Sequence, residues 1–434
     1  MTYGVWGAGR EGKAAVEWLL DRGETDITVA DEREDATLDI PEGANGHVRF
    51  FHGDDSLDHL LDCSIVIVSP GVPGVHGFRT TLSEWGIMVT SGTNLWMAHH
   101  GTCIGVTGTK GKSTTTTLIT ALLNQCGVPA RLAGNIGVPL LGLPDTDQTT
   151  VVELSSYQCA SLTHSPTVAV IVNLYQEHLT WHGSLEAYWR DKCRIFTQGA
   201  STLIADKDTV AKIHGLAIDT SGLDVYSPTT ETDDLIAGAL ALVNLDQLPL
   251  LFSSGPGVHN LSLAILAAQA WGATVRAKDI ARVVVDFTPL PHRLNLVSTA
   301  CGREWYDDTL STSAESVIAA AEALKSRPRI LIVGGQSRGI SYDGLNDYLL
   351  GQQDNPVRII TIPTNGPEMV SPYEQTHPDL VRHASSLADA VRLAASLGPD
   401  GSAIILTPGA PSYDLYPNYE AKSADYTASI TSLT

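Results

Sequence analysis

Short apolar runs alternate with longer amphipathic stretches along most of this chain. The apolar runs predict strands, and the stretches between them predict helices. Predicted strands are 3–6, 26–30, 64–68, 87–90, 102–106, 149–153, 168–173, 202–204, 329–333, 358–362 and 403–406. Because strands and helices alternate repeatedly, the pattern favours parallel sheets with helices on both faces. We therefore expect an α/β fold.

A glycine-rich turn follows the first predicted strand. Gly7, Gly9 and Gly12 have the GxGxxG spacing, and Asp31 follows the second predicted strand. In dinucleotide-binding folds this turn brings a helix N-terminus to a pyrophosphate, and the acid holds a ribose hydroxyl. Alone, the fingerprint would indicate an NAD-dependent oxidoreductase, but a stronger nucleotide signal begins at residue 105. Two phosphate-binding turns imply two phosphorylated ligands.

The run from Gly105 to Thr115, Gly-Val-Thr-Gly-Thr-Lys-Gly-Lys-Ser-Thr-Thr, is that second signal. Glycines in such a loop let backbone N–H groups surround phosphates. Lys112 would supply positive charge near the terminal phosphates, and Ser113 a hydroxyl for Mg²⁺. The run is not a strict GxxxxGK[ST] loop, because Val106 stands where the first glycine is required.

The chain is too long, at 434 residues, for one compact core, and two to three domains are expected. The groups of strands place the domains at 1–97, 98–296 and 297–434. We expect a Rossmann-like N-terminal domain, a P-loop-type central ATPase and a Rossmann-like C-terminal domain.

Two residues near strand ends have side chains suited to binding a metal. Glu153 ends an apolar strand, which places its carboxylate at the sheet edge where ligands of open α/β sheets bind. With Ser113 it would complete a Mg²⁺ site, because Mg²⁺ prefers one or two carboxylates together with phosphates. A solvated acid at a strand end explains the position of Glu153 equally well. His178 follows the strand at 168–173, and a lone histidine is more often structural.

Lys192 lies on the apolar face of a predicted helix at 184–196. The apolar residues of this helix recur at i, i+3 and i+4 spacing. Burial disfavours an ammonium ion and lowers its pKa, and a neutral buried amine can react with CO₂ to give an anionic carbamate that binds metal. The alternative is a lysine that extends its ammonium group to solvent.

The composition limits the classes of partner. There are 27 basic and 48 acidic side chains, a net charge of −21, whereas nucleic-acid binding relies on basic surface. No apolar run approaches the ~18 residues of a membrane span. The N-terminus has no basic region or cleavage site of a signal peptide, and six scattered cysteines without CxxC pairing favour reduced thiols. We expect a cytoplasmic protein that binds neither nucleic acid nor membrane.

Several motifs follow one another in a fixed order over nearly the whole chain. They are Gly105-x-Thr-Gly-Thr-x-Gly-Lys-Ser113, Gly134-Asn-Ile-Gly137, Glu153-Leu-Ser-Ser-Tyr-Gln158, Glu177-His178, Lys192, His259-Asn260, Pro291-His-Arg293 and Asp308. In this order they resemble the motifs of the Mur ligase family, the ATP-dependent amide-forming enzymes of peptidoglycan precursor synthesis. Val106 fits this family, whose loop has its glycine one residue earlier.

The resemblance implies a role for each motif. ATP would be bound by Gly108, Thr109, Lys110, Gly111, Lys112, Ser113, Asn260, Arg293 and Asp308. Two Mg²⁺ ions would be held by Ser113, Glu153, His178 and a carbamylated Lys192. The catalytic residues would be Lys112, Glu153, His178 and Lys192. The reaction would pass through an acyl phosphate, formed when the substrate carboxylate attacks the γ-phosphate of ATP.

Within the family, the compact N-terminal segment with its GxGxxG turn resembles the branch that adds glutamate to UDP-N-acetylmuramoyl-L-alanine. The UDP-sugar contacts implied by this resemblance are Gly7, Gly9, Asp31, Ser69, Asn135 and Ser155. The implied glutamate contacts are Thr312, Arg338, Ser412 and Tyr419. The resemblance also suggests a monomer.

The acceptor region departs from the enzymes that add D-glutamate. Those enzymes have Asp-Ser-Lys-Ala-Thr-Asn where this chain has Asp308-Thr-Leu-Ser-Thr-Ser313, so Leu310 replaces a lysine. Arg338 replaces a second lysine, and arginine grips a carboxylate with a different geometry. With the run 176–182, the pattern resembles a less common branch that adds L-glutamate and relies on a later epimerase. D-glutamate or another acceptor, a folylpolyglutamate synthase and an inactive scaffold remain as alternatives.

Overall fold

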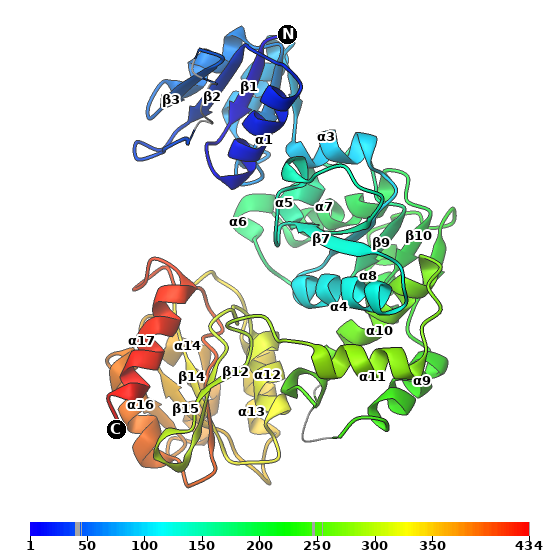
Figure 1. Ribbon diagram of the computed structural model, residues 1–434. Coiled ribbons are helices and arrows are strands. Elements are labelled where there is room, and N and C mark those ends of the chain that lie inside the picture. Colours follow the sequence, from blue (N-terminus) through cyan, green and yellow to red (C-terminus); the bar gives the residue numbers. More distant parts are fainter. Residues whose placement is uncertain (40–43, 45, 245–247, 254, 434) are drawn as a thin grey trace. The chain divides into compact units, whose positions relative to one another are not determined.

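The computed structural model of the chain describes residues 1–39, 44, 46–244, 248–253 and 255–433 (Figure 1). Three sheets follow one another along the sequence, and helices occupy the connections between most strands. The chain divides into two compact units. One comprises Met1–Asn244 and Asn260–Val283 and contains the first two sheets, and the other comprises Leu245–His259 and Val284–Thr434 and contains the third. The predicted α/β class is confirmed, whereas the boundaries at 97 and 296 remain predictions.

The first sheet has five parallel strands in the order β3-β2-β1-β4-β5. Its strands are β1 (Tyr3–Trp6), β2 (Ile27–Asp31), β3 (Val48–His52), β4 (Ile65–Val68) and β5 (Met88–Thr90). Its helices are α1 (Arg10–Asp21), η1 (Ser56–Asp62), α2 (Gly77–Glu84) and α3 (Gly92–His99). The GxGxxG turn packs tightly, since a Cβ on Gly12 would lie 1.8 Å from the carbonyl oxygen of Gly7.

The second sheet has six strands in the order β11-β10-β9-β6-β8-β7, and its pairs are parallel. Its strands are β6 (Ile104–Thr107), β7 (Ala130–Gly134), β8 (Thr149–Glu153), β9 (Val168–Ile171), β10 (Thr202–Ile204) and β11 (Asp224–Tyr226). Around it in the sequence are α4 (Lys112–Gln125), η2 (Leu140–Gly142), α5 (Ser156–Ala160), α6 (Leu179–His182), α7 (Leu185–Thr197), α8 (Lys207–Gly215), α9 (Thr230–Leu240), η4 (Leu250–Ser253), α10 (Gly255–Ala270) and α11 (Ala277–Asp286). Val106 pairs with Glu153 and Thr107 with Ile171, so the carboxyl ends of β6, β8 and β9 meet at one edge.

The third sheet has the order β12-β13-β17-β14-β15-β16, with only the β12–β13 pair antiparallel among the described pairs. Its strands are β12 (Asn295–Ser298), β13 (Glu304–Asp307), β14 (Arg329–Val333), β15 (Arg358–Thr361), β16 (Val381–His383) and β17 (Ala403–Leu406). Its helices are η5 (Ala300–Gly302), α12 (Ala314–Ala323), α13 (Asp343–Leu350), α14 (Gly366–Met369), α15 (Ser371–Thr376), α16 (Leu387–Leu397) and α17 (Tyr419–Thr431).

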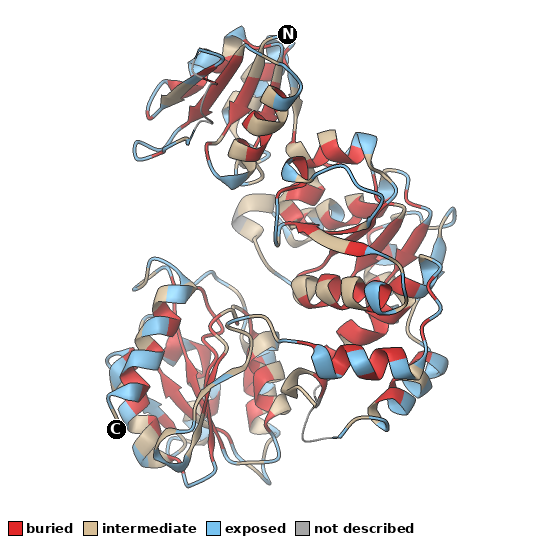
Figure 2. Ribbon diagram, in the orientation of Figure 1, coloured by how far each residue is buried: buried red, intermediate tan, exposed pale blue. Residues whose placement is uncertain are grey.

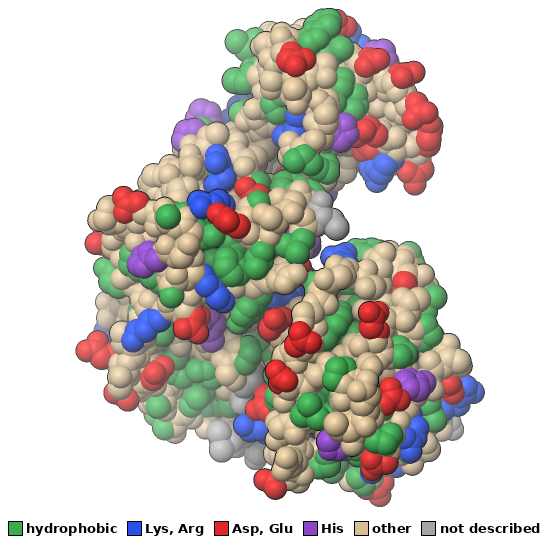
Figure 3. Space-filling view, turned by 180° about the vertical axis from the view of Figure 1, so that it is seen from behind, with side chains coloured by type: hydrophobic (Ala, Val, Ile, Leu, Met, Phe, Trp, Pro, Cys, Tyr) green, Lys and Arg blue, Asp and Glu red, His purple; other side chains and the backbone are tan. Residues whose placement is uncertain are grey.

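The apolar cores lie between the sheets and the helices that cover them. Figure 2 shows the central strands buried, while exposed residues concentrate on helix surfaces and loops. On the face drawn in Figure 3, acidic side chains lie among basic and neutral ones over much of the surface, and several line the upper right edge of the view. None of the helices in the described ranges combines the length and apolar character required to cross a bilayer.

Candidate active site

The loop after β6 leads into the N-terminus of α4 and has features of an anion-binding loop. Gly108 and Gly111 have φ values of +151° and +82°, and α4 begins at Lys112. A Cβ on Gly111 would lie 2.6 Å from Oδ1 of Asn260, so only glycine fits this turn without displacing that amide. The first N–H groups of a helix have no partner within it and attract anions. The predicted phosphate site therefore has the loop-to-helix geometry that it requires, with Ser113 in the first turn of α4.

Two members of the loop are already engaged by other side chains. The backbone amides of Thr109 and Lys110 donate to Oδ1 of Asn173 at 3.1 and 2.9 Å. The ammonium of Lys110 lies 2.9 Å from Oε1 of Glu177. Burial alone would raise the pKa of Glu177, but the charges of Lys110, His178 and Lys112 and the hydrogen bond from Lys110 together outweigh it, and the pKa falls to about 2. The phosphate contacts expected of Thr109 and Lys110 thus remain predictions, and Lys110 also neutralises an acid.

Lys192 is buried on α7, as the spacing of the helix predicted. Its side chain is 1% exposed, which excludes the alternative in which the ammonium reaches solvent. Its Nζ donates to the carbonyl oxygen of Gly108 at 2.7 Å. Burial, and then the charge of Lys112, lower the pKa of Lys192 to about 7. A large share of the amine is therefore neutral and nucleophilic at neutral pH.

Glu153 ends β8 and is also buried, 1% exposed, so the alternative of a solvated acid is wrong. The amide Nδ2 of Asn135 donates to its Oε1 at 2.7 Å. Its Oε2 is buried without a hydrogen-bond partner among the described residues. A buried carboxylate oxygen in this state is costly unless a cation or donor satisfies it, so the site suits a divalent cation.

His178 lies beyond β9 in the left-handed backbone region, with φ 55°. Its Nδ1 and the hydroxyl of Tyr157 are 2.9 Å apart, and its Nε2 lies 3.9 Å from Oε2 of Glu177. No cluster of three His, Cys, Asp or Glu side chains with metal-site spacing exists within the described ranges.

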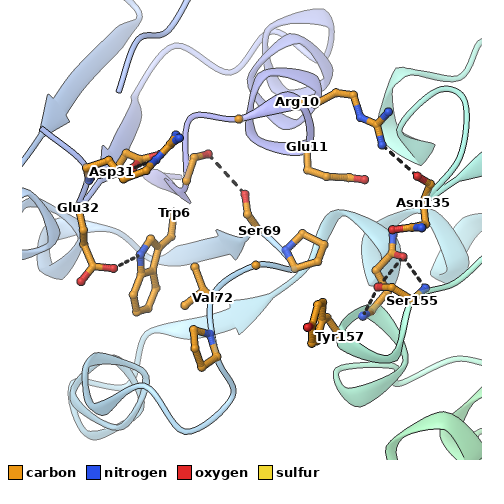
Figure 4. A pocket seen from close by; sticks show the side chains of 17 residues that line it. Trp6, Arg10, Glu11, Asp31, Glu32, Ser69, Val72, Asn135, Ser155 and Tyr157 are labelled. Carbon is orange, nitrogen blue, oxygen red and sulfur yellow. Dashed lines mark hydrogen bonds and ion pairs between the residues drawn. The ribbon is translucent and has the colours of Figure 1, made fainter. Parts of the chain in front are cut away.

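A cleft of about 620 Å³ adjoins these residues within the same compact unit. Its walls come from the GxGxxG turn, the ends of β2 and β4, and the segments after β7 and β8 (Figure 4). Of the predicted UDP-sugar contacts, the cleft is lined by Gly7, Gly9, Asp31, Ser69, Asn135 and Ser155. The structure therefore brings all six together at one cleft.

Asp31 is held inside the cleft wall. Its carboxylate accepts from the backbone amide of Ala8 at 2.8 Å and from two nitrogens of the Arg33 guanidinium, each at 2.9 Å. Burial raises the pKa of Asp31, but the Arg33 hydrogen bond and the backbone donors outweigh it, and the pKa falls to about 2. A ligand of this cleft therefore meets an Asp31–Arg33 pair rather than a lone acid.

The predicted acceptor residues lie in the second compact unit, at the carboxyl ends of neighbouring strands. Arg338 is exposed in the loop after β14, and Ser412 is buried in the segment after β17. The amide of Gln336 donates to the carbonyl of Pro411 at 2.8 Å, so these two segments lie together. The Oγ of Ser412 is buried with no partner in the described part of the chain.

Thr312 and Tyr419 stand just before α12 and at the first position of α17, in the same unit. The ring of Tyr419 meets His292 edge-on, with centroids 5.3 Å apart. Asp308 accepts from the amide of Leu294 at 3.2 Å, and burial raises its pKa to about 7. Arg293 and Asp308 belong to this unit, whereas Asn260 belongs to the unit with the phosphate loop.

Sequence reasoning missed three contacts. The amide of Asn135 holds Glu153, and Tyr157 holds His178; both residues stood in quoted motifs but without these partners. The third is Lys422, a buried lysine on α17 whose Nζ donates to the carbonyl of Gly334 at 2.9 Å. The sequence contained a signal for this buried lysine, because apolar residues stand at i+4 spacing from Lys422 on its helix, as they do from Lys192.

Comparison with known proteins extends the likeness over the whole chain. A model of the Mur ligase middle domain matches residues 106–247. Proteins named UDP-N-acetylmuramoyl-L-alanine--L-glutamate ligase, from Micromonospora sp. and Salinispora tropica, are 37% and 35% identical to it. These alignments cover 97% and 96% of this chain and 94% and 95% of those proteins.

Solved structures show the same fold at lower identity. MurF from Acinetobacter baumannii has a TM-score of 0.61 at 18% identity, covering 98% of this chain and 90% of its own. The MurF ligase from Thermotoga maritima in complex with ADP has a TM-score of 0.60 at 15% identity, covering 100% and 95%. Because its relatives exceed 30% identity over nearly the full length, the chain belongs to the Mur ligase family of ATP-dependent amide ligases.

Proposed function

We propose that this enzyme adds L-glutamate to UDP-N-acetylmuramoyl-L-alanine, with release of ADP and phosphate. The observation that carries the proposal is the name shared by relatives at 37% and 35% identity, each aligned along at least 94% of its length. The cleft of about 620 Å³ at the GxGxxG turn supports it, because a UDP sugar needs a phosphate-binding turn and room for the base and sugar. The domain roles follow: 1–97 for the UDP sugar, 98–296 for ATP and 297–434 for glutamate.

ATP would bind with its phosphates at the start of α4, beside Lys112. The ligands for two Mg²⁺ ions would be Ser113, Glu153, His178 and Lys192. The buried, unpartnered Oε2 of Glu153 is the feature that fits a cation best. When bound, Mg²⁺ would neutralise charge that develops on the phosphoryl oxygens.

Lys192 would act as a carbamate rather than as a free amine. Three features support this: complete burial, a pKa of about 7 and the neighbouring Lys112 cation. A neutral amine attacks CO₂ and loses a proton, and the resulting anion would pair with Lys112 and bind a metal.

The reaction would proceed in two steps. First, a carboxylate oxygen of the substrate attacks the γ-phosphorus of ATP, and the bond to the ADP oxygen breaks. Second, the amine of glutamate attacks the acyl carbon, and the tetrahedral intermediate expels phosphate as the amine loses its proton. Lys112 would stabilise charge on the transferred phosphoryl group, and the loop amides at the start of α4 would hold it in line.

L-glutamate is favoured over D-glutamate by the acceptor loops. Leu310 and Arg338 stand where the D-glutamate enzymes have lysines, so one point charge is lost and a bidentate guanidinium replaces the other. Thr312, Ser412 and Tyr419 would complete the contacts. We further propose a cytoplasmic monomer whose product is later epimerised by a separate enzyme.

The test is turnover with each enantiomer. Purified protein receives UDP-N-acetylmuramoyl-L-alanine, ATP and Mg²⁺ with either L- or D-glutamate, and phosphate release is followed. Turnover with L-glutamate supports the proposal. Turnover with D-glutamate alone would assign the chain to the D-glutamate reaction, and no turnover with either would refute glutamate as the acceptor.

A further inference from the structure

Two side chains belong at once to the wall of the cleft and to the surroundings of the metal ligands. Tyr157 and Asn135 both line the cleft, and Figure 4 shows them there, Tyr157 on α5 and Asn135 just after β7. The hydroxyl of Tyr157 lies 2.9 Å from Nδ1 of His178. The amide of Asn135 lies 2.7 Å from Oε1 of Glu153.

We propose that Tyr157 is a positioning residue that couples occupancy of the cleft to the cation site, with Asn135 as a second, parallel link. The inference rests on the proposed function in one respect, namely that the cleft takes a UDP sugar and that Glu153 and His178 hold the cation. It adds an energetic dependence between the two sites and names the residues that transmit it.

The surroundings of Tyr157 limit how its ring moves. The centroid of its ring lies 4.8 Å from that of Trp181. It lies 5.7 Å from the centroid of His182, on which it stacks with an interplanar angle of 13°. His182 is itself fixed from both sides, since Nδ1 lies 2.6 Å from Asp191 and Nε2 lies 3.1 Å from Ser156. One side of the Tyr157 ring is thus packed against Trp181 and His182, which are held in place. A ligand in the cleft would contact the other side of the ring.

A ligand that packs against Tyr157 would therefore hold the ring against these two side chains and keep its hydroxyl on His178. With Nδ1–H donating to that hydroxyl, Nε2, which lies 3.9 Å from Oε2 of Glu177, is the nitrogen that would hold a cation. Partners of this kind fix the tautomer and orientation of a ligating histidine, and their loss typically weakens metal binding about 10–100-fold.

Asn135 would position Glu153, the other proposed cation-binding residue, in a similar way. The Arg10 guanidinium, from the start of α1, donates to the carbonyl oxygens of Asn135 and Gly137, each at 3.2 Å. The GxGxxG turn, the Asn135 turn and Glu153 are therefore joined by consecutive hydrogen bonds. A phosphate at the start of α1 would act on the first member of this series, and Glu153 is the last.

Binding measurements with the full-length protein test the coupling. Mn²⁺ replaces Mg²⁺ as an observable ion, and its affinity in the presence of a non-hydrolysable ATP analogue is measured by electron paramagnetic resonance. The titration is run with and without UDP-N-acetylmuramoyl-L-alanine. The readout is the ratio of the two Mn²⁺ affinities, so a general loss of sugar binding is measured separately from the coupling.

In the unaltered protein we expect the sugar to tighten Mn²⁺ binding about fivefold or more, and Mn²⁺ to tighten sugar binding by the same factor. In Tyr157→Phe, which removes one oxygen and keeps the ring, this factor should fall below about twofold. Asn135→Ala should also reduce it. Tyr226→Phe is the matched control, because Tyr226 lies on the edge strand β11, 45% exposed, in the same unit.

The outcomes separate the inference from the proposed function. Sugar binding without any effect on Mn²⁺, or full coupling in Tyr157→Phe, would overturn the inference and leave the proposed function standing. Failure of the unaltered protein to bind the UDP sugar at any ion concentration would overturn the proposed function and this inference with it.

Discussion

The Nζ of Lys192 donates to the carbonyl oxygen of Gly108 across 2.7 Å. A residue from the buried face of α7 is thereby fixed to the glycine that starts the phosphate loop. The same amine has a pKa of about 7, because burial and then the Lys112 charge disfavour its ammonium form. The loop that would bind ATP therefore holds Lys192 in position, and burial together with the Lys112 charge sets its protonation.

Carbamate formation on Lys192 should increase with pH. The neutral amine is the reactive form, and its fraction grows as the pH rises through about 7. With ¹³C-labelled bicarbonate, NMR should show a carbamate signal that is several-fold stronger at pH 8 than at pH 6 when dissolved CO₂ is held constant. Lys192→Met should abolish the signal, whereas Lys207→Met, at the start of α8, should retain it. An unaltered protein with no signal, and activity indifferent to CO₂, would contradict the carbamate.

The Lys110–Glu177 pair should stabilise the first compact unit. Lys110→Met leaves a buried carboxylate without its cation, which costs about 3–5 kcal/mol for a fully buried pair. Because the Lys110 side chain is 22% exposed, we expect a smaller loss of unfolding free energy, about 2 kcal/mol at pH 7. Urea denaturation measures it.

The pH dependence of this loss has a defined sign. The pKa of Glu177 is depressed to about 2 in the folded protein, so its contribution is present above the unfolded value near 4.5 and is lost as the pH falls toward 2. The difference between the unaltered protein and Lys110→Met should therefore shrink from pH 5 to pH 3. The double variant Lys110→Met/Glu177→Gln should recover much of the stability at pH 7. A difference that stays constant with pH would contradict the ion-pair account.

Arg338 should act on glutamate and leave the other substrates unaffected. It is exposed at the loop after β14, where a guanidinium can bind a carboxylate with two hydrogen bonds. Arg338→Lys keeps the charge but loses this geometry, so the KM for L-glutamate should rise about tenfold, the equivalent of one such hydrogen bond. Initial rates would show it, with the KM for ATP as an internal control. Equal changes in both KM values would argue against a role in the acceptor site.

Lys422 should stabilise the loop after β14, which also carries Arg338. Its Nζ donates to the carbonyl of Gly334, and burial lowers its pKa to about 8. Lys422→Met removes the donor, so we expect a loss of about 1–3 kcal/mol in unfolding free energy and a higher KM for glutamate. Thermal denaturation and initial rates measure these effects, and Lys325→Met, an exposed lysine paired with Glu322, is the control. A variant with unchanged stability and KM would show that the contact has no role.

The sequence predicted those parts of the fold that depend on local pattern. Apolar runs identified β1, β8, β10, β14 and β17 with their observed bounds, because these strands are mainly buried and have clear turns at their ends. Strands β3, β7, β11, β12, β13 and β16 were missed. For the exposed edge strand β11 and the partly exposed β3, pairing with a neighbour, rather than their own composition, makes them strands.

The same distinction applies to the site. The position of Lys192 on the apolar face of one helix follows from periodicity, and it was predicted, whereas its burial was left open against an ammonium group that extends to solvent. The contact of Asn135 with Glu153 joins the residue after β7 to the last residue of β8, and that of Tyr157 with His178 joins the segments that follow two strands. Such contacts depend on how separate segments pack, so no local pattern could identify them. The acceptor residues were proposed only through a family resemblance.

The account as a whole depends on transfer of a phosphoryl group to the substrate carboxylate before L-glutamate attacks. UDP-N-acetylmuramoyl-L-alanine with ¹⁸O in that carboxylate, incubated with ATP, Mg²⁺ and L-glutamate, tests this step directly. The account predicts that each phosphate released carries one ¹⁸O atom, because the acyl C–O bond breaks when the amide forms. Release of unlabelled phosphate during amide formation, or label transfer only with D-glutamate, would contradict it.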